Sequence, residues 1–322
     1  MDSSEIIAET TQYPPKYVKE GEASNVWMKS LVSLAIYLGL GYYIFKRWDI
    51  IILITAIVLI HEMGHFLAMK AFRYKDLGIF FIPLLGAYVS GTKREVSQRE
   101  SAIILLAGPL PGIILGILFY FLGESNPFLT IGDTSYYTIS LFFVILNLFN
   151  LLPVYPLDGG QLLNRVYFNE SNWLSKIFIL LSIGLLSWFA WKTNPALFIF
   201  PAFMLFRLIG ESKISSIEKR IEAEGINTDV EYEDLPDEDY WKIRNILIDE
   251  HPSFRDVQSA PPYEYSSKEE KIMTTIQGLL HRHLVQDVSV AGKIFILVIW
   301  VAAIASPWLV NMDMSFFHRF GF

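Results

Sequence analysis

The sequence predicts an α-helical membrane protein that crosses the bilayer several times. Apolar residues make up 52% of the 322 residues and aromatic residues 15%. A typical soluble domain reaches only about half apolar residues even when glycine is included. A helix needs about 20 apolar residues to cross a bilayer, and seven apolar runs reach or approach this length. They cover residues 31–45, 51–69, 102–122, 136–152, 173–191, 195–209 and 294–310.

Two of these runs, 31–45 and 195–209, are short. We expect them to be tilted, to be flanked by interfacial aromatic residues, or to cross the bilayer incompletely. The first 25 residues are polar and contain Pro14 and Pro15, so we expect no signal peptide there. The predicted divisions are a polar N-terminal tail (1–29), a membrane-embedded core (30–210), an acidic cytosolic helical segment (211–290) and a C-terminal transmembrane helix with its tail (291–322).

The net charge of −7 comes from one segment of the chain. Residues 211–290 contain eighteen Asp and Glu against nine Lys and Arg, so the rest of the chain is mildly basic. An acidic segment argues against nucleic acid as a partner and against docking to anionic lipids. The chain has no cysteine, which excludes disulfides and thiolate metal sites. Any protein ligands of a metal must therefore be His, Asp or Glu.

The basic residues set the expected orientation. Residues 70–100 carry six Lys and Arg, whereas residues 123–135 carry none, so the first segment is expected in the cytoplasm and the second outside. Alternation along the chain then places residues 211–290 in the cytoplasm. Lys46 and Arg47 fall on the outer side, against the rule, where long side chains can reach the interface.

The second apolar run contains the pentapeptide His61-Glu62-Met63-Gly64-His65. An ionisable residue within a span costs about 2.5–3.5 kcal/mol on insertion scales, so three within five positions need compensation, which a bound metal would supply. Residues four apart share one face of a helix, so both imidazoles can bind one ion. In catalytic zinc sites three protein ligands leave a position for water, and Glu62 would be the base beside it. The alternative is a buried, hydrogen-bonded histidine pair.

A second polar group follows the fourth apolar run. It consists of Asn147, Asn150, Pro153, Pro156, Asp158, Gly159 and Gly160. The second and fourth spans are both expected to run from outside to inside, so His65 and Asp158 reach a similar depth and Asp158 can complete the metal site. The alternative is a membrane-exit turn, in which Asp and Gly are common. For Asn147 the sequence favours a hydrogen bond between helices over a place on a water path.

Together the two motifs resemble the site-2 protease family of intramembrane zinc metalloproteases. That family pairs His-Glu-x-x-His in one span with Asn-x-x-Pro-x-x-x-Leu-Asp-Gly in a later one, and both patterns are present within residues 51–160. The resemblance implies a core of about six transmembrane helices and Zn²⁺ as the cofactor. The roles it implies are zinc ligand for His61, His65 and Asp158, catalytic base for Glu62, and contact with the substrate or the oxyanion for Asn150.

Two further segments resemble parts of the same family. Residues 78–89 resemble its short membrane-associated β hairpin, which is thought to hold an extended substrate by strand addition. This makes Gly86 and Tyr88 candidates for substrate binding, and an interfacial loop is the alternative. In the third span glycines recur every fourth residue, which favours close helix packing. Gly112 stands where many members of the family carry asparagine.

The acidic segment 211–290 has helical patterns of its own. Ser267 and Glu270 predict a capping box before one apolar helical stripe. The stripe consists of Ile272, Ile276, Leu279, Leu280 and Leu284. A shorter helix is predicted over residues 238–248. The functional interpretation is a gate, a regulatory partner site or a substrate-recognition module, and the alternative is a small solvated helical insert.

The resemblance implies an intramembrane zinc metalloprotease. Such an enzyme hydrolyses peptide bonds within or next to transmembrane segments of membrane proteins, as in regulated intramembrane proteolysis. Its partners would be a transmembrane protein substrate and the lipid bilayer, and we expect a multi-pass protein of a prokaryotic cytoplasmic membrane with its site toward the cytoplasm. The alternative is a non-proteolytic metal-binding transporter or scaffold. Glu62 distinguishes the two, because a carrier needs no base beside the metal.

Overall fold

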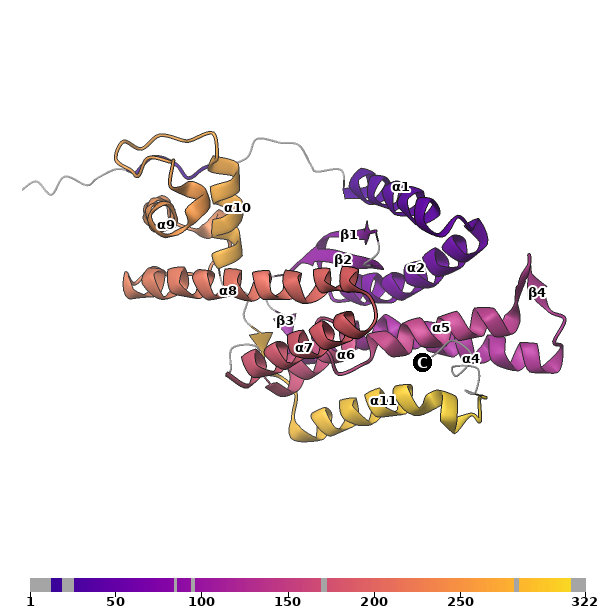
Figure 1. Cartoon of the computed structure of the whole chain (residues 1–322). Helices are drawn as coiled ribbons and strands as arrows, with labels where there is room; N and C mark the ends of the chain where they lie inside the picture. Colours follow the sequence, from indigo (N-terminus) through magenta and orange to yellow (C-terminus); the bar gives the residue numbers. More distant parts are fainter. Residues whose placement is uncertain are drawn as a thin grey trace, which may run out of the picture. The chain divides into compact units, whose positions relative to one another are not determined.

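The structure is a computed structural model that describes residues 13–18, 26–83, 86–93, 96–168, 173–280 and 284–313 (Figure 1). It forms two compact units, which are described separately. The membrane unit comprises Ser24–Pro201 and His283–Phe322, and the acidic unit comprises Met1–Ala23 and Ala202–Arg282. Most of residues 211–290 therefore fold together with a short N-terminal segment.

Four helices among the described residues are long and apolar enough to cross a membrane. They are α2 (Trp48–Ala71), the consecutive pair α3 (Gln98–Ala107) and α4 (Pro109–Ser125), α7 (Trp173–Lys192) and α11 (Val290–Leu309). Two of the predicted runs form shorter apolar helices, α5 (Tyr136–Asn150) and the first part of α8 (Ile199–Ala223). The run 31–45 lies within α1 (Val26–Phe45). The predicted class, a helical membrane protein, is confirmed.

The predicted run 102–122 is two helices and not one. Pro109 is the first residue of α4, and because proline has no backbone N–H it interrupts the helical hydrogen-bond ladder after α3. This break lies against α2. A Cβ added to Gly64 of α2 would lie 1.9 Å from the Ala107 carbonyl oxygen, so only glycine allows the histidine-bearing turn to approach this closely.

The predicted hairpin is present. Strand β1 (Lys75–Ile82) pairs antiparallel with β2 (Gly86–Thr92), with Phe81 opposite Ala87. Phe81 is buried, and its backbone N–H donates to Ser33 Oγ of α1 at 3.1 Å. The hairpin is therefore attached to the first helix. The other strands are β3 (Val96–Ser97), parallel to β6 (Leu284–Val285), and β4 (Thr130–Ile131), antiparallel to β5 (Thr134–Ser135).

Helices α4 and α5 pack closely through small residues, as the glycine spacing predicts. Ser140 Oγ of α5 donates to the Gly116 carbonyl of α4 at 2.7 Å. After α5 the chain is fixed by Trp300 of α11, whose indole N–H donates to the Leu151 carbonyl at 2.9 Å. The chain then enters α6 (Asp158–Leu162), a π-helical turn (Leu163–Phe168), α7 and a 3₁₀ turn (Pro195–Phe198).

The acidic unit has its own apolar core. Its elements are the end of α8, two 3₁₀ turns (Tyr232–Asp234 and Pro252–Phe254), α9 (Asp237–Glu250) and α10 (Glu269–Leu279). Helix α9 confirms the helix predicted over 238–248. Its first turn carries three acidic residues, whose negative charges stabilise the positive end of the helix dipole. Arg244 of α9 and Glu269 of α10 form a buried ion pair, with Nε and Oε1 2.7 Å apart and both side chains 1% exposed.

Two details of the predicted second helix are wrong. The helix ends at Leu279, and Leu284 lies in β6. The predicted capping box of Ser267 and Glu270 is replaced by a contact one residue earlier. There the Ser266 N–H donates to Glu269 Oε2 at 3.0 Å. Glu269 is held there by its partner Arg244, a residue 25 positions earlier that no local pattern identifies.

Replacing Glu269 with alanine should destabilise the acidic unit by about 3–5 kcal/mol, because it leaves the buried Arg244 charge without a partner. The measurement is urea unfolding of the intact protein labelled with 5-fluorotryptophan. Trp241 is the one tryptophan of residues 202–282, so its ¹⁹F resonance reports on this unit. The matched control is Glu238→Ala, which breaks an exposed pair with Lys242 and should cost under about 0.5 kcal/mol. Equal effects would contradict the prediction.

The same ion pair should make the acidic unit sensitive to acid. Burial raises the pKa of Glu269, but the bonds from Arg244 and Tyr240 outweigh it, so the pKa lies below its ordinary value of 4.5. Stability from this carboxylate is then present above pH 4.5 and is lost as the pH falls through the lowered value. The Trp241 resonance should show that the stability difference between wild type and Glu269→Gln shrinks as the pH falls below 4.5. A difference that stayed constant would disprove this linkage.

Candidate metal centre

The polar face of α2 carries the first candidate residues. His61, Glu62 and His65 are 6%, 6% and 8% exposed, although they lie within an apolar helix. The two imidazoles lie one turn apart, and their Nε2 atoms are 3.1 Å from each other. The predicted sharing of one helix face is confirmed.

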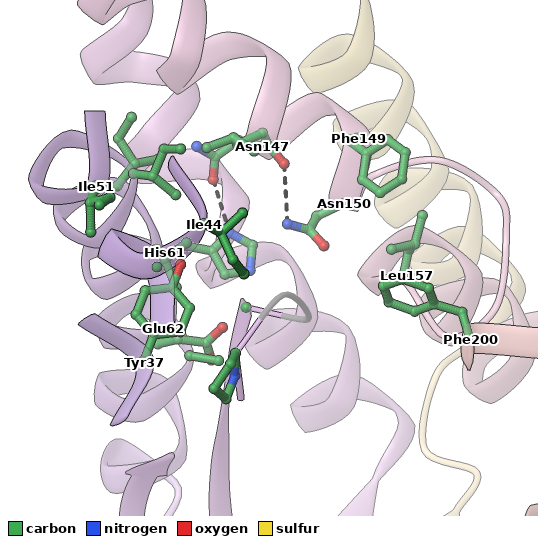
Figure 2. Close-up of a pocket in the computed structure, with 18 residues that line it drawn as sticks. Tyr37, Ile44, Ile51, His61, Glu62, Asn147, Phe149, Asn150, Leu157 and Phe200 are labelled. Carbon is green, nitrogen blue, oxygen red and sulfur yellow. Dashed lines mark hydrogen bonds between the residues drawn. The ribbon is translucent and has the colours of Figure 1, made fainter. Parts of the chain in front are cut away.

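A cavity of about 390 Å³ borders this face (Figure 2). Most of its lining is apolar, and its polar side chains include His61, Glu62, Asn147 and Asn150. Gly86, at the start of β2, also borders it. An apolar cavity with a few polar groups at one place is the usual form of a ligand site.

The second predicted residue of the hairpin, Tyr88, does not border this cavity. Its side chain is half exposed. Its ring stacks on Phe80 of the paired strand, with centroids 5.5 Å apart. Tyr88 therefore stabilises the hairpin surface.

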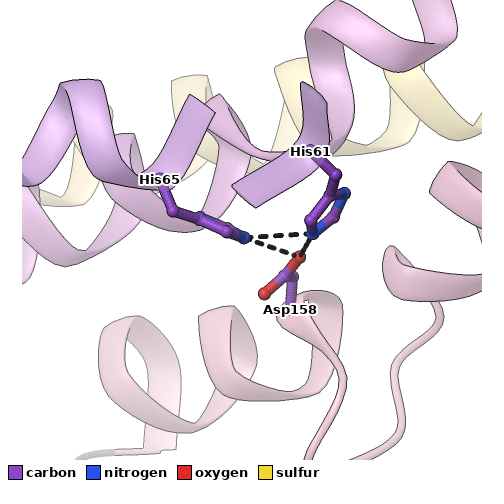
Figure 3. A group of neighbouring side chains, drawn as sticks. All are labelled: His61, His65 and Asp158. Atoms are coloured by element: carbon purple, nitrogen blue, oxygen red, sulfur yellow. Dashed lines mark hydrogen bonds and ion pairs between the residues drawn. The ribbon is translucent and has the colours of Figure 1, made fainter. Parts of the chain in front are cut away.

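Asp158 joins the two histidines, as the sequence predicts. Its Oδ2 lies 3.1 Å from His61 Nε2 and 3.3 Å from His65 Nε2 (Figure 3). All three ligand atoms lie within 4.8 Å of one another, and all three residues are buried. The glycines after Asp158 act through close packing and not through a turn, because a Cβ on Gly159 would lie 2.0 Å from the Leu151 carbonyl oxygen.

Asn147 fixes the tautomer of His61. The Asn147 amide nitrogen donates to the Phe143 carbonyl at 2.7 Å, which turns the amide oxygen toward His61 Nδ1, 2.9 Å away. Because that oxygen can only accept, the hydrogen of neutral His61 is at Nδ1. His65 Nδ1 likewise faces the Ile104 carbonyl oxygen at 2.8 Å, so neutral His65 has the same tautomer.

With the hydrogens at Nδ1, the lone pairs of the two Nε2 atoms and of Asp158 Oδ2 face one another. Both Nε2 atoms are then without hydrogens, and Asp158 Oδ2 has no hydrogen-bond partner in the described structure. A single proton could serve only one of the three contacts, whereas one divalent cation would satisfy both nitrogens and the carboxylate. Two imidazole nitrogens and one carboxylate oxygen are also a ligand set typical of catalytic zinc sites. The residues therefore fit a divalent metal.

Sequence reasoning did not assign Asn147 to the site. It is 1% exposed and lies on α5, 86 positions after His61 in the chain. A Cβ added to Gly112 of α4 would lie 2.1 Å from its amide nitrogen. The space left by Gly112 therefore holds the amide that orients His61. The signal in the sequence was Asn147 itself, for which the sequence favours a hydrogen bond between helices, and its bond to His61 of α2 confirms that expectation.

Comparison with known proteins supports this description. Residues 49–134 match the model of Peptidase family M50. A zinc metalloprotease of Methanocaldococcus jannaschii is 29% identical over 196 residues, which are 56% of this chain and 56% of that protein. Stage IV sporulation protein FB of Bacillus subtilis is 34% identical over 109 residues, 33% of this chain and 36% of that protein.

One solved structure is also similar. A site-2 protease from Methanocaldococcus jannaschii matches with a TM-score of 0.41 and 25% identity, over 56% of this chain and 85% of that chain. The matched stretches cover about half of the first curated relative and about a third of the second. The family match and the curated relatives confirm the resemblance seen in the motifs: residues 49–134 of this chain are similar to Peptidase family M50, and the relatives it matches include a zinc metalloprotease.

Proposed function

We propose that this protein is an intramembrane zinc metalloprotease that hydrolyses peptide bonds within or next to transmembrane segments of other membrane proteins. The observation that carries the proposal is the convergence of His61, His65 and Asp158 beside Glu62, at a cavity between apolar helices. A base next to a metal site distinguishes hydrolysis from simple ion binding. The family and the zinc metalloprotease among its relatives support the same reaction.

His61, His65 and Asp158 would hold Zn²⁺. Bound zinc would polarise the peptide carbonyl and lower the pKa of a water molecule beside it. Glu62 then acts as the general base, because its carboxylate borders the cavity next to His61. It would hold the proton of the attacking water and deliver it to the leaving amine nitrogen. The apolar lining excludes bulk water from this step.

Asn150 and Gly86 are the proposed substrate contacts. The Asn150 amide nitrogen donates to the Leu146 carbonyl at 3.1 Å, and its second N–H is available to a substrate carbonyl or to the developing oxyanion. Gly86 begins β2, which pairs with β1 in a two-stranded sheet of the described residues. An extended substrate would add to the other edge of β2 and be unwound there.

The proposed setting is a prokaryotic cytoplasmic membrane, with the site nearer the cytoplasmic face. The basic residues of 70–100 support this orientation. The partners would be the bilayer and a transmembrane protein substrate, and the acidic residues 211–290 would carry a regulatory contact. Four apolar helices among the described residues support a protein that crosses the membrane several times.

Glu62→Gln should retain bound zinc and lose cleavage by a factor of about 10² to 10⁴, because the amide cannot accept the water proton. The assay is cleavage of tagged single-span proteins by purified, zinc-loaded enzyme, with bound zinc measured in the same samples. Glu124→Gln is the matched control. Glu124 accepts a hydrogen bond from Tyr137 at an exposed position, so this variant enzyme should cleave substrates normally. Zinc binding without wild-type cleavage of any substrate would favour a transporter or scaffold.

Asn147→Leu should weaken zinc binding about 10- to 100-fold, because residues that orient a metal ligand typically contribute this much. Gly112→Ala should act in the same direction by pushing the Asn147 amide away from His61. Gly184→Ala is the matched control, since a Cβ there has no atom within 4 Å. Competition with a zinc-binding dye gives the dissociation constants, and unchanged values in the first two variants would remove the positioning role.

A further inference from the structure

Three aromatic donors of the acidic unit face residues 13–18. Two of them, Trp241 and Tyr232, are buried in the structure. The donors are the indole N–H of Trp241 and the hydroxyls of Tyr232 and Tyr265. Trp241 and Tyr265 are stacked, with ring centroids 5.8 Å apart and planes at 7°. We call these three residues the aromatic surface. Tyr263 packs beside the aromatic surface, and its ring centroid lies 5.3 Å from that of Trp241.

Each donor of the aromatic surface binds a backbone carbonyl of residues 13–18. The bonds run from Trp241 to Pro14 O at 2.8 Å, from Tyr265 to Pro15 O, and from Tyr232 to Tyr17 O at 2.6 Å. Two of these carbonyls belong to the prolines, which have no backbone N–H, so this part of the segment is bound through its acceptors. The segment is therefore recognised as an extended peptide.

Lys16 gives this recognition its specificity. Its backbone N–H donates to Asp237 Oδ1 at 2.7 Å. Its Nζ donates to the carbonyls of Glu233 and Leu235, each at 2.6 Å, and lies 5.7 Å from the centre of the Tyr232 ring. Two carbonyls and a ring face together form a site for the cationic side chain, and the Asp237 carboxylate binds the backbone beside it.

The aromatic surface is held in place from behind. The Arg244 guanidinium lies 5.0 Å from the centre of the Trp241 ring and is fixed by its buried pair with Glu269. Burial raises the pKa of Tyr232 and Tyr265, so both hydroxyls are protonated and can donate at neutral pH. A surface that is preformed loses little entropy when a peptide binds.

The peptide side is also ordered in advance. A residue before proline is restricted to extended conformations, so Tyr13 and Pro14 are biased toward the shape that the surface binds. Aromatic grooves that bind proline-rich peptides in this conformation are a recurring mode of recognition. Residues 13–18 belong to no helix or strand, so the rest of the unit does not need their backbone for its secondary structure.

We propose that the acidic unit is a receptor for extended peptides of the form aromatic-Pro-Pro-Lys-aromatic, with residues 13–18 as its tethered ligand. A partner protein carrying such a sequence binds the same aromatic surface by displacing them. Because residues 13–18 belong to the same chain, their binding is intramolecular, and a partner must compete with it. This role does not depend on the proposed proteolysis.

The test measures binding of a fluorescein-labelled peptide with the sequence of residues 13–18 to the intact protein by fluorescence anisotropy. A released variant, Tyr13→Ala/Lys16→Glu/Tyr17→Ala, should bind it at least about tenfold more tightly than wild type does, because its own segment no longer competes. Val18→Ala should behave as wild type, since Val18 is 67% exposed. A peptide with Glu in place of Lys should not bind.

Adding Tyr232→Phe and Tyr265→Phe to the released variant should weaken peptide binding about tenfold or more, because two hydroxyl donors are lost while both rings remain. The ¹⁹F resonance of Trp241 shows whether the unit is folded. If the released variant unfolded, or bound the peptide no more tightly than wild type, the proposal would be wrong. A wild-type dimer that the released variant cannot form would indicate exchange between copies and would also overturn it.

Discussion

The membrane unit depends on one electrostatic constraint: two imidazole nitrogens and a carboxylate oxygen meet at buried positions among apolar helices. Their lone pairs repel unless a cation lies among them, and the apolar surroundings make any unbalanced charge costly. The hydrogen bonds to Nδ1 of His61 and His65 direct this arrangement, because they leave Nε2 of each ring without a hydrogen. The binding of a metal is thus prepared by groups that do not touch it.

Close helix contacts make these bonds achievable. Gly64 lets α2 approach the end of α3, and the space beside Gly112 of α4 admits the amide of Asn147. In a membrane, helices gain little from apolar burial against each other and depend on close packing and hydrogen bonds instead. The same contacts therefore hold the helices together and orient a metal ligand. A methyl group at either glycine affects both.

The acidic unit follows a different principle, because paired polar groups lie within its apolar core. Arg244 and Glu269 bond to each other, and the Tyr240 hydroxyl donates to the same carboxylate. The Arg244 guanidinium, held by Glu269, packs against the ring of Trp241. Fixed aromatic donors are suited to bind a peptide backbone, and residues 13–18 of the same chain accept their hydrogen bonds.

The sequence by itself determined the class of the protein through its apolar runs, and the shared helix face of His61 and His65 through their spacing of four residues. The sequence indicated the hairpin and Asp158 through its resemblance to the site-2 protease family, because Asp158 is far from the histidines in the chain and its own neighbours also fit a turn. It could not determine which residue orients His61, since that depends on how α5 is rotated against α2. The sequence also did not reveal the Arg244–Glu269 pair, so the predicted capping box at the start of α10 was one residue too late. Nor did it reveal the contact of residues 13–18 with Trp241. Each of these joins positions distant in the chain, where only tertiary packing decides which polar groups meet.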